Sequence, residues 1–155
     1  FSVPLQAAYC ASKHGILGFA DSLRLELKRE GSGVQVCTVM PGSTNTPFFD
    51  HARARLGGAN PMPLPPAYDP ISVARAIAHV AEHPQRDVVV GFAGKLFILL
   101  KRLSPSLLDA ALLMNDSGAQ LQTSDRPDDR SDNLTEPSRG VRPARGQWGN
   151  EWWSR

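Results

Sequence analysis

Apolar side chains near the amino terminus recur at intervals of three and four residues, the period of an α-helix. Within residues 8–28 the repeat comprises Ile16, Phe19, Ala20, Leu23 and Leu27. This spacing predicts one long helix that buries these positions as a stripe. Lys28 and Arg29 then place cations where the helix dipole favours them, and Gly31 supplies a stop signal.

Further along, short apolar runs alternate with helical periods. Residues 34–40 read VQVCTVM and residues 87–91 read DVVVG, so both predict buried strands of a parallel sheet. Residues 95–103 and 105–114 predict two short helices with crowded apolar faces. The alternation of helices and strands indicates the α/β class.

Another helix is predicted between the two strands. Asp69 and Pro70 are suited to the N-cap and the first turn, and the pattern continues to His83. Its predicted buried stripe is Val73, Ile77, Val80 and Ala81. His79 and His83 lie one turn apart, but no carboxylate or further ligand accompanies them, so we predict no metal site.

The composition is that of an ordinary globular protein. The net charge is +2, charged residues make up 21% and apolar residues 41%, which argues against nucleic acid as a main partner. Cys10 and Cys37 form neither a metal motif nor a disulfide framework, so we expect a reducing, cytoplasmic location. No apolar run reaches the length of about 18 residues that a membrane span requires.

After Asn115 the chain changes character. Residues 120–137 are polar and charged, and residues 138–155 are basic with several Pro and Gly and three tryptophans. Low hydrophobicity with many helix breakers favours disorder. We therefore predict a folded part over residues 1–115 and a polar, disordered tail over residues 116–155.

Tyr9 and Lys13 lie four residues apart at the head of the first predicted helix. Residues at this spacing share one helix face, so the phenol and the ammonium can point into one site. A nearby cation favours the phenolate form, which makes the phenol a better acid and base near neutral pH. The alternative is a core-edge aromatic beside a solvated charge, which is the usual meaning of this spacing by itself.

The surroundings of this pair carry further motifs. Residues 4–8 read PLQAA, residues 9–15 read YCASKHG, and the strand pattern ends in PGSTNT at residues 41–46. Together these motifs resemble the second half of the short-chain dehydrogenase/reductase family, over about residues 3–137. The segments DRP and DNL within residues 125–134 resemble the C-terminal end of one bacterial-type subgroup.

The resemblance implies the C-terminal half of a Rossmann-type, doubly wound parallel sheet and an oxidoreductase that interconverts a carbonyl and an alcohol. Tyr9 is then the general acid and base, and Lys13 assists it and holds the nicotinamide ribose. The implied contacts with the NAD or NADP cofactor come from Tyr9, Lys13, Pro41, Gly42, Thr44 and Thr46. The chain contains no glycine-rich phosphate loop, and the family's serine would lie upstream of Phe1, so we expect a fragment that is inactive alone.

The stretch after this motif is rich in Pro, Gly, Ala and Arg, and residues 46–67 match the family's substrate-covering loop. Phe48 and Phe49 are candidates for the wall of an apolar pocket, which suggests an apolar carbonyl or alcohol substrate. The alternative is that they only attach the loop to the core.

Two segments are candidate contact surfaces. In the family the helix matching residues 9–28 faces its copy in a second subunit, so the resemblance implies a homo-oligomer. Residues 95–114 combine apolar faces with Lys95, Lys101 and Arg102, which suits a protein contact or a pocket wall, or alternatively a membrane surface. A competing hypothesis for the whole chain is a noncatalytic, truncated module for dimerisation or for binding a partner or a membrane surface.

Overall fold

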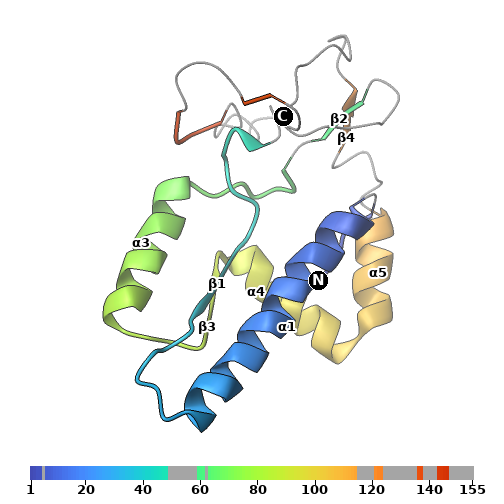
Figure 1. The fold of residues 1–155 in the computed structure, drawn as a ribbon. Coiled ribbons are helices and arrows are strands. Elements are labelled where there is room, and N and C mark those ends of the chain that lie inside the picture. The colour runs from blue at the N-terminus through green and yellow to red at the C-terminus, as the bar shows by residue number, and fades with distance from the viewer. Residues whose placement is uncertain are drawn as a thin grey trace. The chain divides into compact units, whose positions relative to one another are not determined.

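The computed structural model describes residues 1–4, 6–48, 59–61, 63–114, 121–123, 136–137 and 143–146. The chain forms two compact units (Figure 1). The first unit comprises Phe1–Gly42 and Ile71–Leu112, and the second comprises Ser43–Pro70 and Leu113–Arg155.

The elements alternate largely as the sequence pattern predicts. In chain order they are α1 (Ala7–Arg29), β1 (Thr38–Pro41), β2 (Ala59–Pro61), α3 (Pro70–Glu82), β3 (Asp87–Val90), α4 (Phe92–Leu103), α5 (Pro105–Met114) and β4 (Leu121–Thr123). β1 and β3 form a parallel pair in the first unit, and β2 and β4 form an antiparallel pair in the second. The predicted α/β class, with part of a Rossmann-type parallel sheet, is confirmed.

Helix α1 matches the prediction for residues 8–28 to within one residue at each end. Its end is a glycine cap. Gly31 adopts the left-handed conformation with φ 68°, its N–H donates to the Lys28 carbonyl at 3.2 Å, and the Ser32 N–H donates to the Leu27 carbonyl at 2.9 Å. These two bonds form a Schellman motif, which satisfies carbonyl groups that the end of the helix leaves unpaired.

The buried side of α1 differs from the predicted stripe. Ala20 is buried and Leu23 and Leu27 are half-buried, but Ile16 is 54% and Phe19 68% exposed. The helix instead packs on its unit along the line of its most covered apolar residues, Cys10, Leu17, Ala20, Leu23 and Leu27. Both faces of α1 carry apolar residues, and one residue turns the helix by about 100°, so periodicity alone did not select the correct face.

The parallel pair β1 and β3 brings distant parts of the chain together. Thr38 lies opposite Asp87, and the register continues to Pro41 opposite Val90. β1 is shorter than the predicted strand over residues 34–40 and begins only at Thr38. The carbonyl of Val36 accepts a hydrogen bond from the Arg24 side chain at 2.8 Å rather than from a neighbouring strand.

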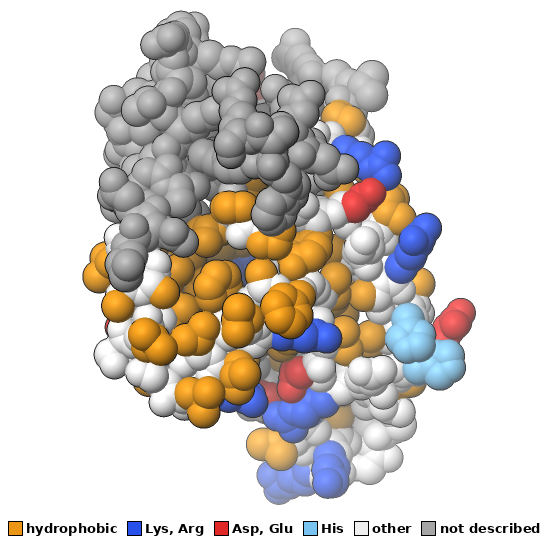
Figure 2. Space-filling view, turned by 180° about the vertical axis from the view of Figure 1, so that it is seen from behind, with side chains coloured by type: hydrophobic (Ala, Val, Ile, Leu, Met, Phe, Trp, Pro, Cys, Tyr) orange, Lys and Arg blue, Asp and Glu red, His pale blue; other side chains and the backbone are white. Residues whose placement is uncertain are grey.

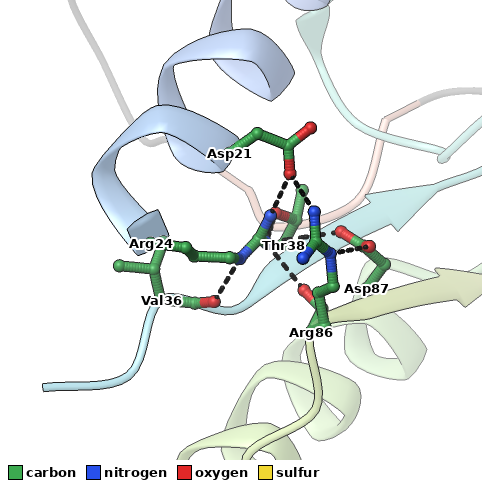
Figure 3. Close-up of polar contacts among 6 residues, drawn as sticks. All are labelled: Asp21, Arg24, Val36, Thr38, Arg86 and Asp87. Atoms are coloured by element: carbon green, nitrogen blue, oxygen red, sulfur yellow. Dashed lines mark hydrogen bonds and ion pairs between the residues drawn. The ribbon is translucent and has the colours of Figure 1, made fainter. Parts of the chain in front are cut away.

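The side chain of Arg24 joins α1 to the amino ends of both strands (Figure 3). Its guanidinium also donates to the Arg86 carbonyl at 2.8 Å and to the Thr38 hydroxyl. The Arg24 side chain is only 12% exposed. A single planar guanidinium therefore holds one helix and two strand ends in place.

Two carboxylates neutralise this cluster. Asp21 Oδ1 lies 2.7 Å from Arg24 Nη1 and 2.6 Å from Arg86 Nη2. Asp87 Oδ1 lies 3.3 Å from Arg24 Nη2, and its Oδ2 lies 3.3 Å from Arg86 Nε. The four residues form a closed network of alternating charge.

Helix α3 begins at Pro70, as the sequence predicts. It buries Val80 at 4% exposure and half-buries Val73 and Ala76. The predicted burial of Ile77 and Ala81 is wrong: Ile77 is 53% exposed, and Ala81 is also exposed. The helix contacts its unit along a line narrower than its apolar face.

Helices α4 and α5 follow β3 closely. Gly94 is buried, and a Cβ at this position would lie 3.3 Å from Val89 Cγ1, so the glycine lets α4 approach β3. Leu108 of α5 is 3% exposed. Other large apolar side chains on these helices stay exposed, namely Phe92, Leu96, Leu99, Leu103, Leu107 and Leu113. Figure 2 shows apolar side chains gathered over one face of the molecule.

None of the helices in the described ranges is long and apolar enough to cross a membrane. The division into residues 1–115 and 116–155 stays a prediction, because only residues 121–123, 136–137 and 143–146 of the expected tail are described.

Candidate active site

Tyr9 and Lys13 occupy the first turns of α1 and approach each other. Lys13 Nζ lies 5.4 Å from the centroid of the Tyr9 ring, within the distance at which a cation is attracted to an aromatic face. Tyr9 is 45% exposed, and Lys13 is also exposed. The expected juxtaposition of phenol and ammonium is present, while their catalytic roles stay predictions.

The neighbours of Tyr9 explain its outward orientation. Cys10 is buried at 8% exposure, and Tyr9 lies about 100° from it around the helix. The Ser12 hydroxyl donates to the Tyr9 carbonyl at 2.7 Å, and the Cys10 N–H donates to the Gln6 carbonyl at 2.8 Å. These bonds hold the turn that presents the phenol.

Pro41 and Gly42 lie at the carboxyl end of β1. This is the edge at which open α/β sheets bind ligands. The Gly42 N–H donates to the Val90 carbonyl at 2.9 Å, so the start of the following loop is attached to β3. Both residues belong to the first unit, as do Tyr9 and Lys13.

Thr44 and Thr46 belong to the second unit, in a loop that is held by Tyr68. The Asn45 N–H donates to the Tyr68 carbonyl at 2.9 Å, and the Tyr68 N–H donates to the Ser43 carbonyl at 2.8 Å. The Thr46 N–H turns back to the Thr44 carbonyl at 2.9 Å. These main-chain bonds fix the loop that carries Thr44 and Thr46.

The remaining predicted site residues are Phe48 and Phe49. Phe48 is 51% exposed, and Phe49 lies outside the described residues. His79 and His83 stack with ring centroids 4.7 Å apart. Within the described ranges no group of three or more His, Cys, Asp or Glu side chains could hold a metal ion.

Sequence reasoning missed two sets of residues. Nothing near Arg24 in the sequence indicates its partners, because it bonds to Arg86 across 62 residues. Arg145 and Gly146, in the expected tail, contact Asp69, Asn45 and Thr46 in the second unit. The only local signal was the position of Tyr68 and Asp69 directly before the predicted helix start at Pro70, which marked residues 68–69 as structurally important.

Comparisons with known proteins agree with the motifs. The family model described as short chain dehydrogenase matches residues 1–57. The uncharacterized oxidoreductase YxnA of Bacillus subtilis (strain 168) is 34% identical over 123 residues, which are 79% of this chain and 34% of the relative. No solved structure gives a significant match.

Two further relatives carry names of the same kind. Dehydrogenase/reductase SDR family member 7B of Danio rerio is 31% identical over 110 residues, which are 68% of this chain and 35% of the relative. The human 15-hydroxyprostaglandin dehydrogenase [NAD(+)] is 44% identical over 48 residues, which are 31% of this chain and 18% of the relative.

The chain spans about a third of the length of the first relatives that it matches. The matching residues include the YCASK and PGSTNT motifs. The motifs, the family match and the partial parallel sheet agree: this chain belongs to the short-chain dehydrogenase/reductase family.

Proposed function

We propose that the natural full-length protein is a cytoplasmic NAD(P)-dependent oxidoreductase that interconverts a carbonyl and an alcohol. One observation carries this proposal: a lysine ammonium lies 5.4 Å from the centroid of a tyrosine ring on one face of α1. A phenol beside a cation is suited to exchange a proton with a substrate oxygen. The names of the relatives, which include oxidoreductases and dehydrogenases, support the same class.

In the reduction direction, the Tyr9 hydroxyl donates its proton to the substrate carbonyl oxygen, and it takes this proton back in the oxidation direction. Lys13 stabilises the phenolate that is left after proton donation. When bound, the nicotinamide cofactor supplies or accepts the hydride. The exposure of Tyr9 leaves its side of α1 open to a substrate.

The chain offers a donor set that fits part of this cofactor. The Tyr9 hydroxyl and the Lys13 ammonium can bond the hydroxyl groups of a ribose, and Thr44 and Thr46 carry hydroxyl groups in the loop that follows β1. Pro41 and Gly42 lie at the strand edge where such ligands bind. We propose that Tyr9, Lys13, Pro41 and Gly42 contact the nicotinamide end and, on the basis of the sequence motif alone, that Thr44 and Thr46 do so as well. The human relative's name specifies NAD(+), which supports testing this form first.

We propose an apolar substrate and Phe48 as one of its contacts, because this large aromatic side chain is 51% exposed directly after the loop of Thr46. Phe49 is the second candidate, on the basis of the sequence. The chemical identity of the carbonyl or alcohol is open to assay with aliphatic and aromatic compounds.

We also propose that the free face of α1 binds a second copy of this protein. Phe19 is 68% exposed, and a Cβ added at Gly15 or Gly18 would meet no atom within 4 Å. An apolar helix face with small residues is suited to close packing against another helix. The exposed leucines of α4 and α5 are another candidate contact surface, for which membrane vesicles are one partner to test.

The decisive experiment assays the full-length protein with NAD and NADP on a panel of apolar alcohols and carbonyls, alongside Tyr9→Phe. We expect turnover in the natural protein, and loss of turnover with largely unchanged cofactor affinity in the variant, because only the proton donor is removed. Near-normal kcat in Tyr9→Phe would disprove the role of Tyr9. Absence of turnover and of cofactor binding in the natural protein would disprove the proposed function itself.

A further inference from the structure

Gly146 lies directly against Asn45 and Thr46, although about a hundred residues separate them in the sequence. The Gly146 N–H donates to the Asn45 carbonyl at 3.1 Å. A Cβ added at Gly146 would lie 2.5 Å from the Thr46 carbonyl oxygen and 2.7 Å from its carbonyl carbon. Since these are backbone atoms, only a glycine can approach this closely without displacing the loop.

The contact pairs the main-chain carbonyl of Asn45. Its N–H donates to the Tyr68 carbonyl at 2.9 Å, and its carbonyl accepts from the Gly146 N–H. The main chain of Asn45 is therefore bonded to Tyr68 through its N–H and to Gly146 through its carbonyl. Loss of the Tyr68 or the Gly146 contact would remove one of these two main-chain hydrogen bonds of Asn45.

A charged pair adds a second attachment beside the first. Arg145 Nη2 lies 2.7 Å from Asp69 Oδ2, and its Nε donates to Asp69 Oδ1 at 3.3 Å. The hydrogen bond and the charge of Asp69 raise the pKa of Arg145 above its ordinary value. Arg145 is 64% exposed, so the pair contributes only modestly to stability. Its bidentate geometry nevertheless fixes the relative orientation of the two side chains.

The two attachments involve adjacent residues on each side. Arg145 precedes Gly146, and Asp69 follows Tyr68. The ion pair of Arg145 thus positions the segment directly before Gly146, the residue that bonds to Asn45. We call residues 143–146 the strap.

We propose that the strap is a positioning element for the loop of residues 43–46 and thereby sets the affinity of the protein for its nicotinamide cofactor. This inference rests on the proposed function, in which Thr44 and Thr46 contact the cofactor. The strap touches the loop through Asn45 and Thr46, so it acts on the cofactor through them. It lies beyond residues 1–57, the part that the family model matches.

The strap contact itself is tested without any assay of activity. Hydrogen exchange of the full-length protein is followed by mass spectrometry in Gly146→Ala and in the matched control Gly33→Ala, where an added Cβ meets no atom within 4 Å. We expect exchange in peptides covering residues 43–46 to accelerate by about tenfold or more in Gly146→Ala and to stay unchanged in the control. Equal exchange in both variants would contradict the claim that the strap holds the loop of residues 43–46.

The peptides covering β1 and β3 report whether Gly146→Ala has folded. Arg145→Gln, with exposed Arg75→Gln of α3 as its control, provides a second and milder variant. We expect a smaller acceleration in Arg145→Gln than in Gly146→Ala, because it leaves the backbone contact sterically possible. Arg145→Lys should restore part of the protection, since it keeps the charge and loses the two-pronged geometry.

The effect on cofactor binding is measured by titrating the same proteins with NAD and NADP. We expect Gly146→Ala to weaken the preferred cofactor by about fivefold, the scale of one lost hydrogen bond, and to leave kcat at saturating cofactor within about twofold. Faster loop exchange with unchanged cofactor affinity would overturn the proposed positioning. If the natural protein bound neither cofactor, the proposed function would be disproved. The hydrogen-exchange result would then still test whether the strap holds the loop of residues 43–46.

Discussion

Arg24 donates a hydrogen bond from Nη2 to the main-chain carbonyl oxygen of Arg86 at 2.8 Å, across 62 residues of the chain. The same guanidinium bonds to the Val36 carbonyl at 2.8 Å. The contact thus links α1 to the segments that lead into β1 and β3, at the amino ends of the strands. Pro41 and Gly42 lie at the opposite, carboxyl ends, which is the edge where open α/β sheets bind ligands.

Arg24→Ala should destabilise the full-length protein by about 2 kcal/mol, because it removes the Arg24 bond to the Val36 carbonyl and one of two donors each from the Arg86 carbonyl and the Asp21 carboxylate. Urea denaturation followed by circular dichroism measures the free energy of unfolding. Arg75→Ala, at an exposed arginine of α3, should change it little. A similar loss in both variants would contradict the linking role of Arg24.

Lys13→Met should lower kcat by about a hundredfold, the scale expected for lost support of a general acid and base. It should also weaken cofactor binding, because the ammonium is a proposed ribose contact. Steady-state kinetics and cofactor titration separate the two effects. Lys28→Met, at the exposed opposite end of α1, is the control. Unchanged cofactor affinity in Lys13→Met would leave Lys13 with its electrostatic role alone.

Gly31→Ala should cost about 1 kcal/mol of unfolding free energy, because a Cβ disfavours the left-handed conformation at the end of α1. Gly33→Ala should be close to neutral, since Gly33 lacks a positive φ and its Cβ would meet no atom within 4 Å. Thermal unfolding of the two variants side by side tests the difference. Equal stability would show that the helix end tolerates rearrangement.

Phe19→Asp should shift the full-length protein from a homodimer toward a monomer, because a carboxylate would be buried in the proposed contact between copies of α1. Light scattering coupled to size exclusion measures the molar mass. Val34→Asp introduces the same charge at another exposed apolar position, which is 63% exposed, and should leave the mass unchanged. A natural protein that is monomeric at all concentrations would rule out this contact.

Local signals predicted the elements well. Pro70 marks the start of α3, and Pro105 marks the start of α5, whose bounds agree with the prediction for residues 105–114. Gly31 ends the helical signal of α1. These features depend on the backbone preferences of single residues, which can be read in the sequence.

Features that depend on distant partners were not predictable in this way. Ile16 and Phe19 have the periodicity of buried residues, yet they lie on the open face of α1, because the choice of face depends on what packs there. The partners of Arg24 and the place of Gly146 require the tertiary structure. The Tyr9 and Lys13 pair was the part of the candidate site that sequence could indicate, because both residues lie on one helix.

The pairing of Thr38 with Asp87 makes the intervening chain a closed loop with both ends anchored. The entropy cost of closing such a loop grows only with the logarithm of its length, at about 0.6 kcal/mol for each doubling. The entropy of loop closure therefore changes little with insertions and deletions between the two strands, provided that they spare α3 and its buried Val80. The segment proposed to contact the substrate lies inside this loop, so evolution can vary its length and sequence while the strand pair and its arginine link persist.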